Sequence, residues 1–125
     1  MSTMVKKLLL RGSKGSITVE VLFDSGAFFS FIKKAIAEKI GELQKLPEPE
    51  VFSTAKEGEE VIATHTIDIK FYINKDGFPE IFYVIDNLSE DAIIGVGTMQ
   101  KFRFKLDFER DEICLLYTSD DFKII

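Results

Sequence analysis

A four-residue motif near position 24 carries the residue types that acid catalysis requires. Asp24-Ser25-Gly26-Ala27 directly follows an apolar segment of strand-like composition, residues 17–23, so a carboxylate is delivered to a turn at the end of a buried strand. Burial disfavours an isolated charged carboxylate, and such a group usually has a partner or a chemical role. Far along the chain, Ile93-Ile94-Gly95 closes a second apolar segment on a glycine. The two motifs together predict an active-site loop and the element that supports it.

Other hydrolytic chemistries are poorly supported by the sequence. His65 is the only histidine and Cys114 the only cysteine. A zinc site needs several such ligands, so no metal is expected. A nucleophilic triad built on Ser25 would need His65 as its base, and nothing in the spacing brings the two together. We therefore predict acid chemistry at Asp24, without metal or cofactor.

The bulk composition indicates one small globular domain, residues 1–125. Apolar residues make up 46% and charged residues 30%, which is typical of a folded chain. The net charge of −5 argues against a nucleic-acid partner. No apolar run approaches the roughly 20 residues of a membrane helix, so no membrane partner is expected. A single cysteine favours a reducing compartment, and the predicted location is cytoplasmic.

Hydrophobic periodicity predicts a mostly-β chain with one or two short helices. Side chains alternate with period two in several segments, which is typical of half-buried strands. The predicted strands are residues 4–10, 17–23, 67–73, 81–85, 102–108 and 113–117. From Ser30 the spacing becomes helical, with Ile32, Ile36 and Ile40 four residues apart and Gly41 as the C-terminal cap. A second short helix is expected over residues 96–101.

A charged hairpin is predicted between the two motifs. Short strands over residues 51–55 and 61–65 flank Lys56-Glu57-Gly58-Glu59-Glu60. These strands show few apolar residues that could anchor them in a core. Low anchoring predicts low local stability and large motion for residues 55–61.

The order of these features resembles the retropepsin-like fold of retroviral-type, single-lobe aspartic proteases. The resemblance runs from about Val5 to Leu116 and implies a closed β-barrel, the acid protease half-lobe. It implies that Asp24 is the catalytic residue, within an active-site loop formed with Ser25, Gly26 and Ala27. It also implies a flap hairpin and a substrate cleft, to which the resemblance assigns Phe28, Ser53, Thr54, Ala55, Gly58, Ile93 and Ile94.

The mechanism implied by this resemblance uses two carboxylates that share one proton and activate a water molecule between them. The chain contains one Asp-Ser-Gly motif, so the simplest arrangement is a homodimer in which two copies of Asp24 meet on a two-fold axis. Residues 122–125 or the N-terminal strand would add to the subunit contact. The substrate would be a peptide or protein.

Two positions depart from the pattern of many viral members of this family. Phe28 and Val96 stand where those proteins place an acidic residue and an arginine, which form an ion pair. We expect an apolar contact between Phe28 and Val96 to replace that pair. A second hypothesis follows from this departure: a catalytically weak module of the same fold that mediates dimerisation or binds peptides.

Overall fold

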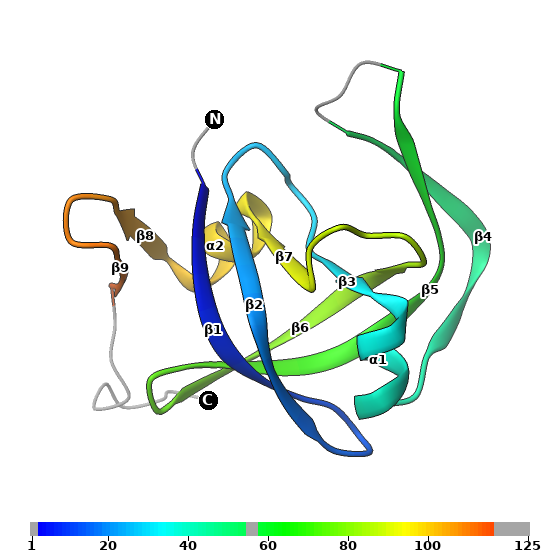
Figure 1. Ribbon diagram of the computed structural model, residues 1–125, viewed down its shortest axis with the longest axis horizontal. Helices are drawn as coiled ribbons and strands as arrows, with labels where there is room; N and C mark the ends of the chain where they lie inside the picture. The colour runs from blue at the N-terminus through cyan, green and yellow to red at the C-terminus, as the bar shows by residue number, and fades with distance from the viewer. Residues whose placement is uncertain (1–2, 55–57, 117–125) are drawn as a thin grey trace.

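Among residues 3–54 and 58–116, which the computed structural model describes, six strands close into a mixed β-barrel (Figure 1). These strands are β1 (Thr3–Arg11), β2 (Ser16–Asp24), β3 (Phe31–Lys33), β5 (Glu60–Ile73), β6 (Asp76–Ile85) and β7 (Ala92–Gly95). Neighbours follow the order β1-β2-β7-β3-β6-β5, and β5 pairs back onto β1 to close the ring. The predicted closed barrel of a mostly-β chain is confirmed.

Period-two alternation fills the barrel with apolar side chains. On β2, Val19, Val21 and Phe23 are buried, while the residues between them are more exposed. Strand β5 repeats this pattern with four buried residues from Ile67 to Ile73. Each fully buried side chain of this size stabilises the fold by roughly 1.5–3 kcal/mol.

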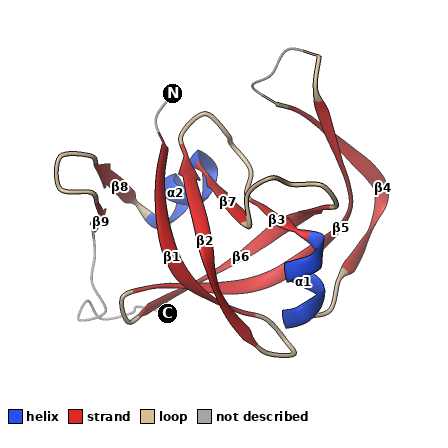
Figure 2. Cartoon of the chain, viewed as in Figure 1, coloured by secondary structure: helices blue, strands red, loops and turns tan. Residues whose placement is uncertain are grey.

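A seventh strand, β4 (Gln44–Ser53), pairs only with β5 and extends the sheet beyond the barrel (Figure 2). Its register shifts between Lys45 and Glu50, around Pro47 and Pro49. Proline lacks the N–H that a central strand must donate, so this segment is suited to an edge. The sequence predicted separate strands over residues 61–65 and 67–73; the structure has one strand, β5, with an irregularity between Ala63 and His65.

The first helix begins later than the spacing predicts. Ile32 lies in β3, opposite Val84 of the parallel strand β6, and α1 spans Lys34–Ile40. Ile32 is fully buried in this strand, and a buried isoleucine fits the spacing of a helix as well, so the spacing could not tell helix from strand. Gly41 follows the helix, but its φ of −168° is extended rather than left-handed.

The second helix, α2 (Val96–Phe102), lies where it was predicted and ends at Arg103 in the left-handed conformation. Strands β8 (Phe104–Asp107) and β9 (Glu112–Leu115) form a separate two-stranded sheet beside the barrel (Figure 2). The predicted strand over residues 102–108 is too long, because Phe102 belongs to α2 and Phe108 is exposed. In the described part of the chain each helix has seven residues, too short to cross a bilayer.

Candidate active site

Strand pairing brings the two sequence motifs together. Strands β2 and β7 run parallel, and Asp24 at the end of β2 lies opposite Gly95 at the end of β7. The Asp24 carboxylate accepts a hydrogen bond from the Gly26 backbone N–H at 2.8 Å. The backbone carbonyl oxygen of Asp24 accepts another hydrogen bond, from the Ala27 N–H at 3.1 Å. The carboxylate is therefore held in a tight turn at the barrel end.

The backbone of this loop approaches Gly95 so closely that only a glycine fits at that position. A Cβ at Gly95 would lie 2.7 Å from the carbonyl oxygen of Ala27, 2.5 Å from that of Phe28, and closer still to that of Phe29. Carbon atoms do not approach backbone oxygens so closely, so no side chain fits there. The glycine lets the loop that carries Asp24 lie directly against the end of β7.

Backbone hydrogen bonds fix the same loop to the start of α2. The Val96 N–H donates to the Ala27 carbonyl at 2.6 Å, and the Gly97 N–H donates to the Phe28 carbonyl at 2.9 Å. These bonds use amide groups at the first turn of α2, which lack partners within the helix. Backbone groups thus attach the loop to α2, and these two hydrogen bonds involve no charged side chain.

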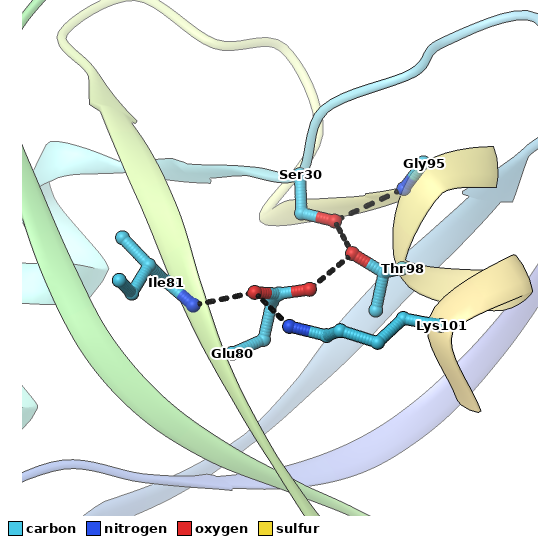
Figure 3. Close-up of polar contacts among 6 residues, drawn as sticks. All are labelled: Ser30, Glu80, Ile81, Gly95, Thr98 and Lys101. Atoms are coloured by element: carbon cyan, nitrogen blue, oxygen red, sulfur yellow. Dashed lines mark hydrogen bonds and ion pairs between the residues drawn. The ribbon is translucent and has the colours of Figure 1, made fainter.

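A chain of buried hydroxyl groups continues this attachment (Figure 3). The Gly95 N–H donates to the Ser30 hydroxyl at 3.1 Å, which lies 2.7 Å from the Thr98 hydroxyl. Thr98 in turn donates to the Glu80 carboxylate at 2.7 Å. Because the single proton of Thr98 goes to Glu80, Ser30 must donate to Thr98. The negative charge of Glu80 therefore sets the direction in which the Thr98 and Ser30 hydroxyl groups donate their hydrogen bonds.

Glu80 is the acceptor at the end of this chain of hydroxyl groups. Its carboxylate also accepts from the Lys101 ammonium at 2.8 Å and from the Ile81 N–H at 2.9 Å (Figure 3). Burial raises the pKa of Glu80, but the hydrogen bonds from Lys101, Thr98 and Ile81 outweigh it and hold the pKa below its ordinary value. Glu80 thus remains an ionised acceptor.

A groove of about 550 Å³ opens beside Asp24. The residues that line it come from the active-site loop, the β4–β5 hairpin and residues 87–90. Of the residues that the resemblance assigns to the flap and cleft, Phe28, Ser53, Thr54 and Ile93 line this groove. Asp24, Gly26 and Ala27 of the predicted active-site loop line it too.

The remaining assigned residues lie elsewhere. Ile94 is fully buried in the barrel core, because it alternates with Ile93 along β7, and it does not line the groove. Ser25 is exposed on the loop, and Gly58 is exposed at the hairpin tip with a φ of 75°. Neither lines the groove. Ala55 lies outside the described residues.

Residues 12–121 match the family model of the retroviral aspartyl proteases. The chain belongs to this family. Its fold is similar to the retroviral protease-like domain of Ddi1 from Leishmania major, with a TM-score of 0.69 at 18% identity, covering 92% of this chain and 90% of that one. It is also similar to EIAV protease in complex with the inhibitor HBY-793, with a TM-score of 0.62 at 16% identity, covering 85% and 93%.

A third similar structure is a retropepsin-like aspartic protease from Rickettsia conorii, with a TM-score of 0.50 at 19% identity, covering 86% of this chain and 89% of that one. At such identities the likeness establishes the fold. The retropepsin-like resemblance inferred from the sequence is therefore confirmed.

Within this retroviral aspartyl protease fold, Phe28 meets the first turn of α2 at Gly97, and the expected contact between Phe28 and Val96 stays a prediction. The Phe28 ring lies over Gly97, where an added Cβ would be 2.9 Å from the ring. Val96 packs against the barrel core. The loop is held by backbone bonds and by the Ser30–Thr98 contact, which the sequence analysis missed. The signal that could have found it is a serine between two phenylalanines, a polar residue in an apolar run.

The hairpin of this family member has a firmer base than its sequence suggested. The Phe52 ring lies 5.4 Å from that of Phe29, 5.0 Å from Phe31 and 4.8 Å from Tyr83, centroid to centroid. Val61, opposite Phe52 on β5, packs against the same apolar cluster. The expectation of low apolar anchoring is therefore wrong for the base of the hairpin, because Phe52 meets rings from distant segments.

Proposed function

We propose that this protein is an aspartic endopeptidase that acts as a homodimer, with one Asp24 from each subunit in the catalytic dyad. One observation carries the proposal: the Asp24 carboxylate stands at the end of a barrel strand, in a tight turn, on the wall of a groove. Membership of the retroviral aspartyl protease family supports the same reaction.

The dyad would use a single shared proton. Two carboxylates at contact distance cannot both be charged, so one is ionised and its partner is protonated. The ionised carboxylate takes a proton from a bound water, whose oxygen attacks the peptide carbonyl carbon. The protonated carboxylate donates to the carbonyl oxygen and stabilises the tetrahedral intermediate. Since each chain supplies one Asp24, a two-fold interface must bring the second.

Substrate would lie in the groove in an extended conformation. We assign Phe28, Ser53, Thr54 and Ile93 to its walls, with the hairpin closing over it and excluding water. Gly58, at the tip, would belong to the moving part, and Ala55 lies outside the described residues. The single half-buried cysteine, Cys114, accords with action in a reducing compartment such as the cytoplasm.

A second candidate function is a peptide-binding or dimerisation module without efficient catalysis. The observation that favours it is the apolar pair of residue types at Phe28 and Val96, the positions where the resemblance implies an ion pair in many viral members. Such a module would use the same groove but would not need Asp24 to be ionised.

The decisive experiment compares wild type with Asp24→Asn on a peptide library across pH. We expect wild type to cleave with a bell-shaped profile and an acidic optimum, and Asp24→Asn to fold, associate and bind peptides without cleaving them. Asp68→Asn, an exposed carboxylate on β5, serves as the matched control and should cleave normally. Full activity in Asp24→Asn would eliminate the aspartic mechanism. Binding without cleavage in both proteins would support the second candidate.

A further inference from the structure

Two polar side chains are buried among the residues that the structure describes, those of Ser30 and Thr98, which are 3% and 4% exposed. Their hydroxyl groups lie 2.7 Å apart (Figure 3). A buried hydroxyl group costs free energy unless it is hydrogen-bonded, and an apolar pair of the same shape would fill the space with little loss of stability. Packing alone therefore does not account for this pair, and its role lies in the groups that it connects.

On one side the pair is fixed to the loop that carries Asp24. Ser30 is the last residue of that loop, and its hydroxyl accepts a hydrogen bond from the Gly95 N–H at 3.1 Å. Its backbone carbonyl accepts one from the Tyr83 N–H of β6 at 3.0 Å. Gly95 lies opposite Asp24 in the register of β2 and β7, and it has no room for a Cβ against the loop. A shift of the Ser30 hydroxyl would therefore move the backbone on which the Asp24 turn rests.

On the other side the pair ends at Glu80, whose side chain is 13% exposed. Thr98 donates to its carboxylate, and Lys101 is the cation in contact with it. Glu80 lines a hollow of about 610 Å³ that shares no lining residue with the groove beside Asp24. The other charged residues around this hollow are Arg11, Asp68 and Lys70. Glu80 thus reaches the Asp24 loop by hydrogen bonds through Thr98 and Ser30, and it does not line the groove where substrate would bind.

The acceptor at Glu80 determines whether both buried hydroxyl groups are satisfied. Each hydroxyl group carries one proton. While Glu80 accepts from Thr98, Ser30 donates to Thr98 and keeps a lone pair for the Gly95 N–H. Without that acceptor, two protons remain for the one contact between the hydroxyl groups, so one proton is buried without a partner. Relief of this cost requires Thr98 or Ser30 to shift, and Ser30 moves with the loop.

We propose that Glu80 is a positioning residue for Asp24: through Thr98 and Ser30 it holds the active-site loop in the geometry that cleavage requires. The proposal rests on the proposed function for the reaction itself. It adds a residue outside the groove whose hydrogen bonds determine where the catalytic carboxylate stands. The property of Glu80 that matters for this role is its acceptor oxygen, rather than its ion pair with Lys101.

The kinetic test uses variants that remove or keep the Thr98 hydroxyl. Thr98→Val should lower kcat by roughly tenfold or more and change KM by less than about threefold, because a displaced loop misaligns the reacting atoms. Thr98→Ser keeps the hydroxyl and should retain the wild-type kcat. Ile69→Val, in the barrel core on β5, is the control for lost stability and should also retain it. A wild-type kcat in Thr98→Val would overturn the inference.

Variants of Glu80 and Lys101 separate the acceptor from the ion pair. At a pH above the ordinary pKa of Glu80, Glu80→Leu should lower kcat as Thr98→Val does, whereas Lys101→Met keeps the acceptor and should lower it by less than about threefold. Glu80→Gln keeps an acceptor oxygen that does not titrate, so its loss of kcat in acid should lack one ionisation that wild type and Thr98→Ser show. Equal losses in Glu80→Leu and Lys101→Met, or the same acid limb in Glu80→Gln and wild type, overturn the inference.

Failure of this inference can be told from failure of the proposed function, because the position of the loop has readouts that need no cleavage. These are the NMR signal of the Asp24 carboxyl carbon and the hydrogen-exchange rates of the Gly95 and Gly97 amides. We expect Thr98→Val to shift this signal and to speed exchange by roughly tenfold or more, and Thr98→Ser and Ile69→Val to do neither. If wild type cleaves no peptide, this pattern supports the inference while the proposed function fails. The same signal and exchange rates in Thr98→Val and Ile69→Val overturn the inference, whether or not the protein cleaves.

Discussion

The hydroxyl of Ser30 lies 2.7 Å from the hydroxyl of Thr98, and both side chains are buried. This contact joins the loop that carries Asp24 to helix α2. Ser30 accepts a hydrogen bond from the Gly95 N–H, and Thr98 donates one to the Glu80 carboxylate. A barrel strand, the active-site loop and a helix are thus connected through two neutral groups and one carboxylate.

Replacing Thr98 with valine tests the strength of this connection. Valine has the same shape but cannot donate to Glu80 or accept from Ser30, so two buried polar groups lose a partner. We expect the free energy of unfolding to fall by about 1–3 kcal/mol, measured by chemical denaturation. Thr18→Val, at an exposed site on β2, is the matched control and should change it by less than about 0.5 kcal/mol. Equal effects of the two substitutions would contradict the role given to Thr98.

The lowered pKa of Glu80 predicts a particular dependence of stability on pH. A carboxyl whose pKa is lower in the folded state than its ordinary value of 4.5 stabilises the fold above that value. The stabilisation is lost as pH falls through the lowered folded-state pKa. Glu80→Gln keeps a hydrogen-bond acceptor but removes the charge that attracts Lys101. The stability difference between wild type and Glu80→Gln should therefore be largest near neutral pH and shrink in acid.

Thermal or urea unfolding at several pH values measures this difference. Glu112→Gln, an exposed acid on β9, provides a control whose difference from wild type should stay small throughout. If the loss in free energy of unfolding caused by Glu80→Gln grew as the pH was lowered, this would contradict the lowered pKa assigned to Glu80.

Gly95 and Gly15 offer a matched pair for the close packing of the active-site loop. An added Cβ at Gly95 meets three backbone carbonyl oxygens, which cannot rotate away, whereas at Gly15 it meets no atom within 4 Å. Gly95→Ala should thus displace the loop and lower stability by roughly 3 kcal/mol or more. It should also abolish cleavage, because Asp24 moves with the loop. Gly15→Ala should leave stability and activity close to wild type, and a similar result for Gly95→Ala would refute the packing argument.

Period-two alternation, which is local information, predicted β1 and β2 and parts of β5 and β6, but neither β3 nor β7. The support of the Asp24 loop by the second motif was implied by the resemblance to a known family. Period-two alternation marks β2 and β5, and the parallel pairing of Asp24 with Gly95 is a property of the recognised fold. The hydroxyl chain was not predictable in this way. Ser30, Glu80 and Thr98 belong to three separate segments, and only the folded barrel brings them within hydrogen-bonding distance.

Short apolar segments were the other source of error. Ile32 is buried whether it lies in a helix or a strand, so its spacing from Ile36 suggested one helix where β3 and α1 meet. Phe52 lies in a hairpin whose sequence shows few apolar residues that could anchor it. Its partners Phe31 and Tyr83 come from β3 and β6, and nothing in the local sequence identifies them.

The proposed homodimer predicts self-association that depends on the active-site loop. Two copies of Ser25, related by the two-fold axis, would exchange hydroxyl hydrogen bonds between the loops. Loss of both bonds in Ser25→Ala should raise the dimer dissociation constant by roughly tenfold or more in sedimentation equilibrium. Truncation of residues 122–125, which lie outside the described residues, tests their contribution separately. A wild-type monomer at micromolar concentration, near acidic pH as well as at neutrality, would contradict the dimer.

Within the β4–β5 hairpin we predict a boundary between an anchored base and a moving tip. Phe52 and Val61 hold the base through the ring cluster of Phe29, Phe31 and Tyr83, whereas Gly58 and Glu59 at the tip are exposed. Amide hydrogens near Phe52 should therefore exchange slowly in hydrogen-exchange experiments, and those of Gly58 and Glu59 should exchange fast. A bound peptide mimic should slow exchange at the tip, because closure buries it.

Substitutions on either side of this boundary should act differently. Phe52→Ala should speed exchange through the whole hairpin and lower stability by roughly 3 kcal/mol, as expected for loss of a buried ring. Gly58 has a φ of 75°, which a β-branched residue tolerates poorly, so Gly58→Val should strain the tip and lower turnover at little cost in global stability. Ile62→Ala, on the exposed face of β5, is the control for both. A tip as protected as the strand from Ile67 to Ile73, with and without the peptide mimic, would show that this hairpin is not a flap.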